Sequence, residues 1–107
     1  MKIPSVHYRQ GDVLVERVER LPDGLKPVER EQGRVVLAHG EVTGHAHAIK
    51  NRIAKFFGTE KGERFLSLEK PCDLVHEEHS TIALPAGNYR VSIQREYTPE
   101  AIRNVAD

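Results

Sequence analysis

Short runs of apolar residues, several of them alternating with polar positions, recur along the chain and predict β-strands. The pattern is clearest at residues 13–18 and 89–95, because successive side chains of an extended chain fall on opposite faces. A third run, residues 35–38, is short, rich in β-branched side chains and bounded by Gly33 and Gly40, which favours a buried strand over a helix. The sequence therefore predicts a fold built from several short strands.

Two hairpins are expected among these strands. Residues 44–57 are predicted to form one strand with an interruption near Asn51, and a glycine-containing loop then returns the chain through residues 64–68. The second predicted hairpin joins residues 81–84 to residues 89–95 through the turn sequence Pro-Ala-Gly-Asn. Both hairpins favour antiparallel pairing.

A short C-terminal helix is expected beyond the last strand. Thr98 can cap this helix, Pro99 suits its first position, and Ile102 and Val105 lie three residues apart. We therefore predict a single all-β domain over residues 1–107, mainly antiparallel. It should form a small barrel or sandwich with a short C-terminal helix.

Composition narrows the class of protein. The 107 residues are enough for one core, and the 16 Lys and Arg balance the 16 Asp and Glu, so net charge does not favour a nucleic-acid partner. The lone Cys72 excludes an internal disulfide, and we find neither a signal peptide nor a membrane-spanning stretch. These features predict a cytoplasmic protein whose small core favours stabilisation by a homodimer partner or a bound metal.

The histidines are concentrated in two short segments. GEVTGHAHAI contains His45 and His47, and HEEH contains His76 and His79, which together are four of the six histidines. On a strand, His45 and His47 point to the same face, so both rings can bind one ion while the alanines pack on the other face. The second segment completes this site if it bends. Three histidines with a carboxylate or an open position are typical of a catalytic Zn²⁺ or Fe²⁺ site, whereas four closed ligands are typical of a structural Zn²⁺ site.

Glu77 and Glu78 give the predicted site its acid–base chemistry. In the leading hypothesis they act as ligand, orienting group or general base beside a metal-bound water that hydrolyses a substrate. In a metal-free alternative, paired histidines act as general base and acid, while Arg90 or Arg95 stabilises an anionic transition state, as in a nuclease. A third alternative is a non-enzymatic module that binds a protein or nucleic acid through a hairpin edge.

Two further features are weaker candidates. His39 precedes the first histidine segment and is a candidate extra ligand or a residue that orients a ligand. Gln10, Gly11 and Asp12 could place a carboxylate near the site, although a Gly-Asp pair before a strand is more often a simple turn. Cys72 is expected to be a small buried apolar residue.

The His-x-His pair and residues 84–89, Leu-Pro-Ala-Gly-Asn-Tyr, resemble the two motifs of cupins, the double-stranded β-helix family. The resemblance implies that His45 and His47 bind a metal, and it puts Arg90 where the second motif carries a histidine. Through residues 9–13, both histidine segments and residues 94–100, the chain also resembles small uncharacterised bacterial and phage proteins. That second resemblance implies no activity.

Overall fold

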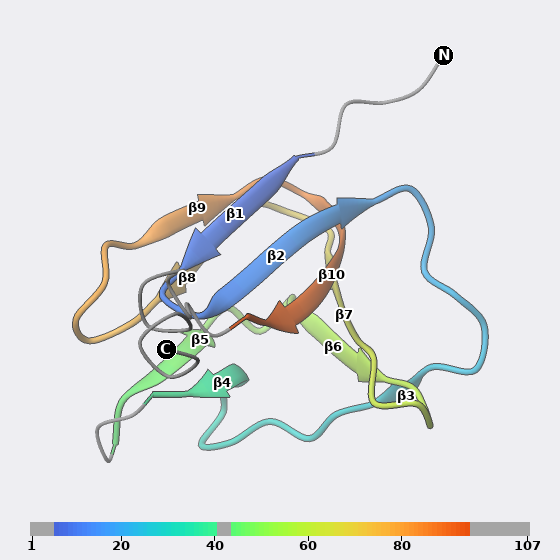
Figure 1. Ribbon diagram of the computed structural model, residues 1–107, viewed down its shortest axis with the longest axis horizontal. Coiled ribbons are helices and arrows are strands. Elements are labelled where there is room, and N and C mark those ends of the chain that lie inside the picture. Colours follow the sequence, from blue (N-terminus) through green and yellow to red (C-terminus); the bar gives the residue numbers. More distant parts are fainter. Residues whose placement is uncertain (1–5, 41–43, 95–107) are drawn as a thin grey trace, which may run out of the picture.

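The computed structural model describes residues 6–40 and 44–94, which form two antiparallel β-sheets (Figure 1). The six-stranded sheet has the order β1 (His7–Gln10), β2 (Val13–Val18), β10 (Gly87–Ile93), β7 (Arg64–Leu68), β6 (Lys55–Gly58) and β3 (Lys26–Pro27). The four-stranded sheet has the order β4 (Val35–His39), β5 (Ala46–Ile49), β8 (Cys72–Val75) and β9 (Ile82–Leu84). The predicted all-β, antiparallel fold is confirmed, and the C-terminal helix predicted after Thr98 lies outside the described residues.

The hydrophobic core draws side chains from both sheets. Its fully buried members include Val13, Val15, Leu66 and Tyr89 from the larger sheet and Leu37, Ile49, Leu74 and Leu84 from the smaller one. Full burial of one such aliphatic side chain contributes about 1.5–3 kcal/mol. The hydroxyl of Tyr89 donates a hydrogen bond to the carbonyl of Pro85 at 2.6 Å, so its burial leaves no polar group unsatisfied.

The segment predicted as one interrupted strand, residues 44–57, divides into β5 and β6, which belong to different sheets. Asn51 makes the turn between them: its side chain accepts a hydrogen bond from the Ile53 amide at 2.9 Å, and its carbonyl accepts one from the Ala54 amide at 3.3 Å. The predicted hairpin that follows is confirmed, because β6 pairs with β7.

The second predicted hairpin is wrong. β9 pairs with β8, through Cys72 opposite Leu84, whereas β10 pairs with β2 and β7 in the other sheet. The turn after β9 therefore carries the chain from one sheet to the other. Alternation of side chains identifies both segments as strands but does not specify the sheet to which each belongs.

The two sheets meet where β1 lies against β9 (Figure 1). The tight turn after β1, formed by Gly11 and Asp12, lies at this end of the molecule and precedes β2. No helical segment in the described part of the chain has the length and hydrophobicity needed to cross a membrane.

Candidate metal centre

The two histidine segments converge. β5 and β8 are antiparallel neighbours in which Ala48 lies opposite Val75, and the next residues outward are His47 and His76. The ring centroids of His47 and His76 are consequently only 4.3 Å apart, and that of His45 lies 5.7 Å from His76. His79, in the loop after β8, lies 4.7 Å from His76.

The bend that this convergence requires is supplied by residues 76–81, which join β8 to β9. Because β8 and β9 are paired at their base, the intervening loop folds back and both of its histidines face β5. Ala46 and Ala48, which alternate with the two histidines, are buried with Val36 in a separate small cluster, as the strand alternation predicts.

His45, His76 and Glu77 form a group whose potential ligand atoms all lie within 4.8 Å of one another. Nitrogen and oxygen ligands bind Zn²⁺ at about 2.0–2.2 Å, so an ion would draw these side chains closer together. Glu77 accepts a hydrogen bond from the amide of Ala46 at 2.9 Å, and a carboxylate has further lone pairs that can bind a cation. This bond lowers the pKa of Glu77, which favours the ionised form.

One ring nitrogen in this group has no hydrogen-bond partner. Nδ1 of His45 is buried and makes no hydrogen bond, and Oε2 of Glu78 lies 3.7 Å away, too far for one. Leaving a buried polar atom unsatisfied costs about 1–3 kcal/mol. Such an atom beside two further potential ligands is consistent with a ligand-binding role.

The ring of His47 is the most buried of the site, with 5% of the residue exposed. Burial is the largest of the effects that lower its pKa to about 4, and the neighbouring His76 and His79 act in the same direction. Burial and His79 also lower the pKa of His76. Both rings are therefore neutral at pH 7, which is the form that binds a metal.

A buried glutamine holds His47. Nδ1 of His47 lies 2.8 Å from Oε1 of Gln10, the last residue of β1. The amide nitrogen of Gln10 donates hydrogen bonds to the carbonyls of Leu74 and Ser80, each at 3.0 Å. The loop histidine His76 instead accepts a hydrogen bond at Nδ1 from the amide of Glu78, at 3.0 Å.

Two glycines allow the backbone to approach the rings. A Cβ atom on Gly11 would lie 2.8 Å from Nε2 of His79 and 3.2 Å from Cε1 of His47. A Cβ atom on Gly40 would lie 3.0 Å from Nε2 of His76. Any larger residue at either position would enter the space between the rings.

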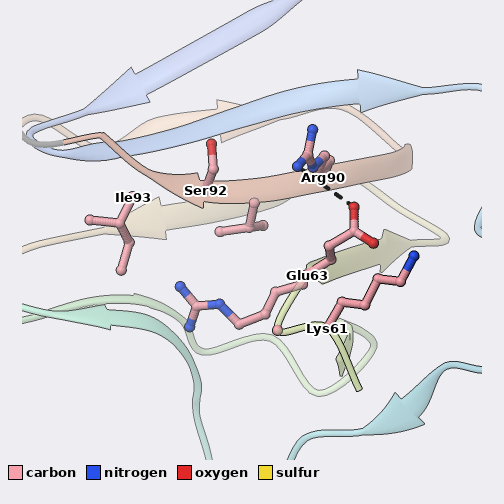
Figure 2. A pocket seen from close by; sticks show the side chains of 8 residues that line it. Lys61, Glu63, Arg90, Ser92 and Ile93 are labelled. Atoms are coloured by element: carbon pink, nitrogen blue, oxygen red, sulfur yellow. Dashed lines mark ion pairs between the residues drawn. The ribbon is translucent and has the colours of Figure 1, made fainter. Parts of the chain in front are cut away.

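Other candidates lie elsewhere. Figure 2 shows Arg90 on β10 beside Glu63, with which it forms an ion pair at 3.6 Å. Arg90 lines a hollow formed by residues 61–64 and 90–93, and none of these residues is a histidine. His39, expected as an extra ligand, is exposed and pairs with Glu31 at 3.0 Å. Cys72 is buried in the core, as predicted, and Arg95 lies outside the described residues.

The sequence indicates Gln10 and Gly11 only as part of a stretch that could place the Asp12 carboxylate near the site, and it does not predict the contacts that they themselves make with the histidines. Gln10 contacts His47 across 37 positions of sequence, so no local pattern connects the two residues. The Gln-Gly-Asp sequence before a strand is the signal that the sequence offers, and it is more typical of a simple turn. That turn exists, and Gly11 has the positive φ of 57° that such a turn uses.

Comparison with protein families shows that residues 9–94 match a domain of unknown function (DUF8820). Comparison with curated proteins and with solved structures gives no match. The resemblance to cupins therefore stays a prediction. The geometry of the histidine cluster is the feature that bears on function.

Proposed function

The chain belongs to the DUF8820 family of unknown function, and we propose from its site that it is a divalent-metal-binding β domain. The observation that carries the proposal is the convergence of His45, His76 and Glu77, whose potential ligand atoms lie within 4.8 Å of one another. The unpaired buried nitrogen of His45 supports it, because a metal would satisfy that atom.

The donor set favours Zn²⁺ or Fe²⁺. Imidazole nitrogen and carboxylate oxygen suit both ions, and two histidines with one carboxylate also match the facial arrangement of non-haem Fe²⁺ sites. His47 and His79 are proposed as further ligands, or as ligands that take the place of one of the first three. The centroids of their rings lie 5.7 Å apart beside His76. A site with three protein ligands keeps a coordination position for water.

For catalysis we propose hydrolysis by that water. A divalent metal lowers the pKa of a bound water and so generates hydroxide near neutral pH. We propose Glu78 as the general base toward this water, supported by its 61% exposed side chain and its distance of 3.7 Å from His45. The exposure of Glu77 and His79 leaves the site open to a substrate from solvent.

Elemental analysis and metal titration test the proposal. Purified protein treated with chelator should bind one equivalent of Zn²⁺ or Fe²⁺, and His45→Ala and His76→Ala should each weaken binding strongly. His39→Ala is the matched control, because this exposed histidine pairs with Glu31 outside the cluster. Equal metal binding by all four proteins would exclude the proposed centre.

The metal-free alternative is tested in the same preparation. Any hydrolytic or nuclease activity that survives excess chelator would favour acid–base catalysis by the histidines alone, with Glu77 or Glu78 orienting a ring. That mechanism assigned Arg90 to the anionic transition state, and the pairing of Arg90 with Glu63 gives it no support. Activity restored only by added metal would support the metal centre.

Partner and location proposals come from the sequence alone. We propose that the protein is cytoplasmic. We also propose that it forms a homodimer, because scarce aromatic residues and small size limit the core of a single chain. Balanced charge does not favour a nucleic-acid partner. Sedimentation velocity over a range of concentrations tests the dimer, and a constant monomeric mass would contradict it.

A further inference from the structure

Gln10 occupies an unusual position for an uncharged polar residue. It is 2% exposed, and its amide makes hydrogen bonds with three groups from distant parts of the chain: His47, Leu74 and Ser80. A buried amide without hydrogen-bond partners would lower the stability of the fold. The side chain of Gln10 is therefore held in place by these hydrogen bonds.

The partners fix the orientation of the amide. Carbonyl oxygens only accept hydrogen bonds, so the two hydrogens on Nε2 of Gln10 must face the carbonyls of Leu74 and Ser80. The reversed amide would place its oxygen against two carbonyl oxygens. Oε1 of Gln10 therefore faces His47, and because Oε1 can only accept, Nδ1 of His47 must carry the hydrogen.

We propose that Gln10 is a positioning residue for the metal centre: it holds the His47 ring with the hydrogen on Nδ1, so that Nε2 is the nitrogen that faces a divalent metal. This inference rests on the proposed function. Ligand histidines commonly donate their other ring N–H to an oxygen acceptor, which fixes both the tautomer and the direction of the ring.

The same side chain ties down the loop. The carbonyls of Leu74 and Ser80 bracket residues 75–79, the segment that contains His76 and His79. One buried amide thus joins the ring on β5 to both ends of the histidine-bearing loop. Pre-positioning of both histidine segments reduces the reorganisation that metal binding requires.

Nitrogen-15 NMR of the metal-free wild-type protein tests the tautomer directly. We expect His47 to show a protonated, pyrrole-like Nδ1 and an unprotonated, pyridine-like Nε2 at pH 7, with an Nδ1 proton that exchanges slowly with solvent. A hydrogen on Nε2 of His47 would overturn the proposal even in a protein that binds metal.

Two variants separate the hydrogen bond of Gln10 to His47 from its two hydrogen bonds to the loop. Gln10→Leu removes all of these hydrogen bonds. We expect a mixed His47 tautomer and a Zn²⁺ affinity lower by about 10- to 100-fold, the usual loss when the hydrogen-bond partner of a ligand histidine is removed. Gln10→Glu keeps only an acceptor, so His47 should retain its Nδ1 hydrogen while amide exchange in residues 75–79 becomes faster. Gln94→Leu is the matched control, because the Gln94 side chain is exposed and accepts a hydrogen bond from Arg9.

The outcomes distinguish this inference from the proposed function. Wild-type protein that binds no metal overturns the metal centre. If the wild type binds metal but the Gln10→Leu and Gln94→Leu variants have the same Zn²⁺ affinity and the same His47 tautomer, the proposed role of Gln10 is wrong and the metal centre stands. If Gln10→Leu does not fold, Gln10→Glu and the wild-type spectrum still decide the question.

Discussion

At the scale of single residues, His47 links the site to folding stability. Burial and two neighbouring imidazoles lower its pKa from 6.5 to about 4. Between these pH values the unfolded chain binds more protons than the folded chain, so acid favours unfolding. We expect the free energy of unfolding of the metal-free protein to fall as the pH is lowered from 6.5 towards 4. Urea titrations in the presence of chelator measure this dependence.

His47→Gln provides the control for this pH dependence. The variant has no ring to titrate at this position, so its stability should change less over the same pH range. His76 contributes in the same direction, because its pKa is also lowered. A variant with a pH dependence as steep as that of the wild type would show that His47 is not responsible.

Gly11 gives a second prediction at this scale. Gly11→Ala combines a positive φ of 57° with a Cβ atom 2.8 Å from Nε2 of His79, whereas Gly24→Ala has a φ of 78° and no neighbour within 4 Å. Backbone strain should cost both variants about 1–3 kcal/mol. Only Gly11→Ala should also lose Zn²⁺ affinity, as measured by calorimetry. Equal affinities would show that the turn does not approach the site.

Single residues also show the limit of sequence interpretation. His45 and His47 were identifiable because strand periodicity puts them on one face, and that geometry depends only on local backbone. Gln10 was not identifiable, because its contact with His47 depends on how β1 is placed against β5 and β9. The expectation that His39 is an extra ligand also relied on local sequence. His39 is close to His45 in sequence, yet it pairs with Glu31 outside the cluster.

At the scale of elements, the loop between β8 and β9 must change when a metal binds. The amide of Glu78 donates to Nδ1 of His76 at 3.0 Å. If the metal binds Nδ1, the acceptor lone pair is lost, and if it binds Nε2 of a neutral ring, Nδ1 carries a hydrogen. Either way Glu78 loses its acceptor. We expect faster amide exchange at Glu78 in the metal-bound protein, measured by NMR.

The β6–β7 loop is the internal control for this exchange experiment. The amide of Gly62 donates to the carbonyl of Thr59 at 3.0 Å, in a loop without a histidine. Its exchange should be the same with and without metal. An unchanged Glu78 amide in protein that binds metal would show that His76 is not a ligand.

The elements themselves were largely predictable, and their pairing was less so. The alternation around Tyr89 and Val91 correctly identified a half-buried strand, and the short glycine-containing loop correctly predicted the β6–β7 hairpin. The turn at Pro85 looks equally like a hairpin in sequence, yet it carries the chain between sheets. That difference arises from packing between sheets, which a local pattern does not record.

At the scale of the whole molecule, metal binding should stabilise the fold. The proposed ligands come from the residue before β5 and the loop after β8, so an ion would cross-link segments separated by about thirty residues of sequence. A ligand that binds only the folded state at 100 times its Kd adds about 2.7 kcal/mol. For a domain of this size we expect the melting temperature to rise by roughly 10 °C.

Metal choice and a paired variant make this melting experiment decisive. Mg²⁺ and Ca²⁺ prefer oxygen ligands, so they should shift the melting temperature much less than Zn²⁺ or Fe²⁺ at the same concentration. The double variant His45→Ala/His76→Ala should melt at the same temperature with and without Zn²⁺. His39→Ala should keep the full shift, because its exposed ring pairs with Glu31. A Zn²⁺ shift that persists in the double variant would mean that the ion binds another part of the folded chain.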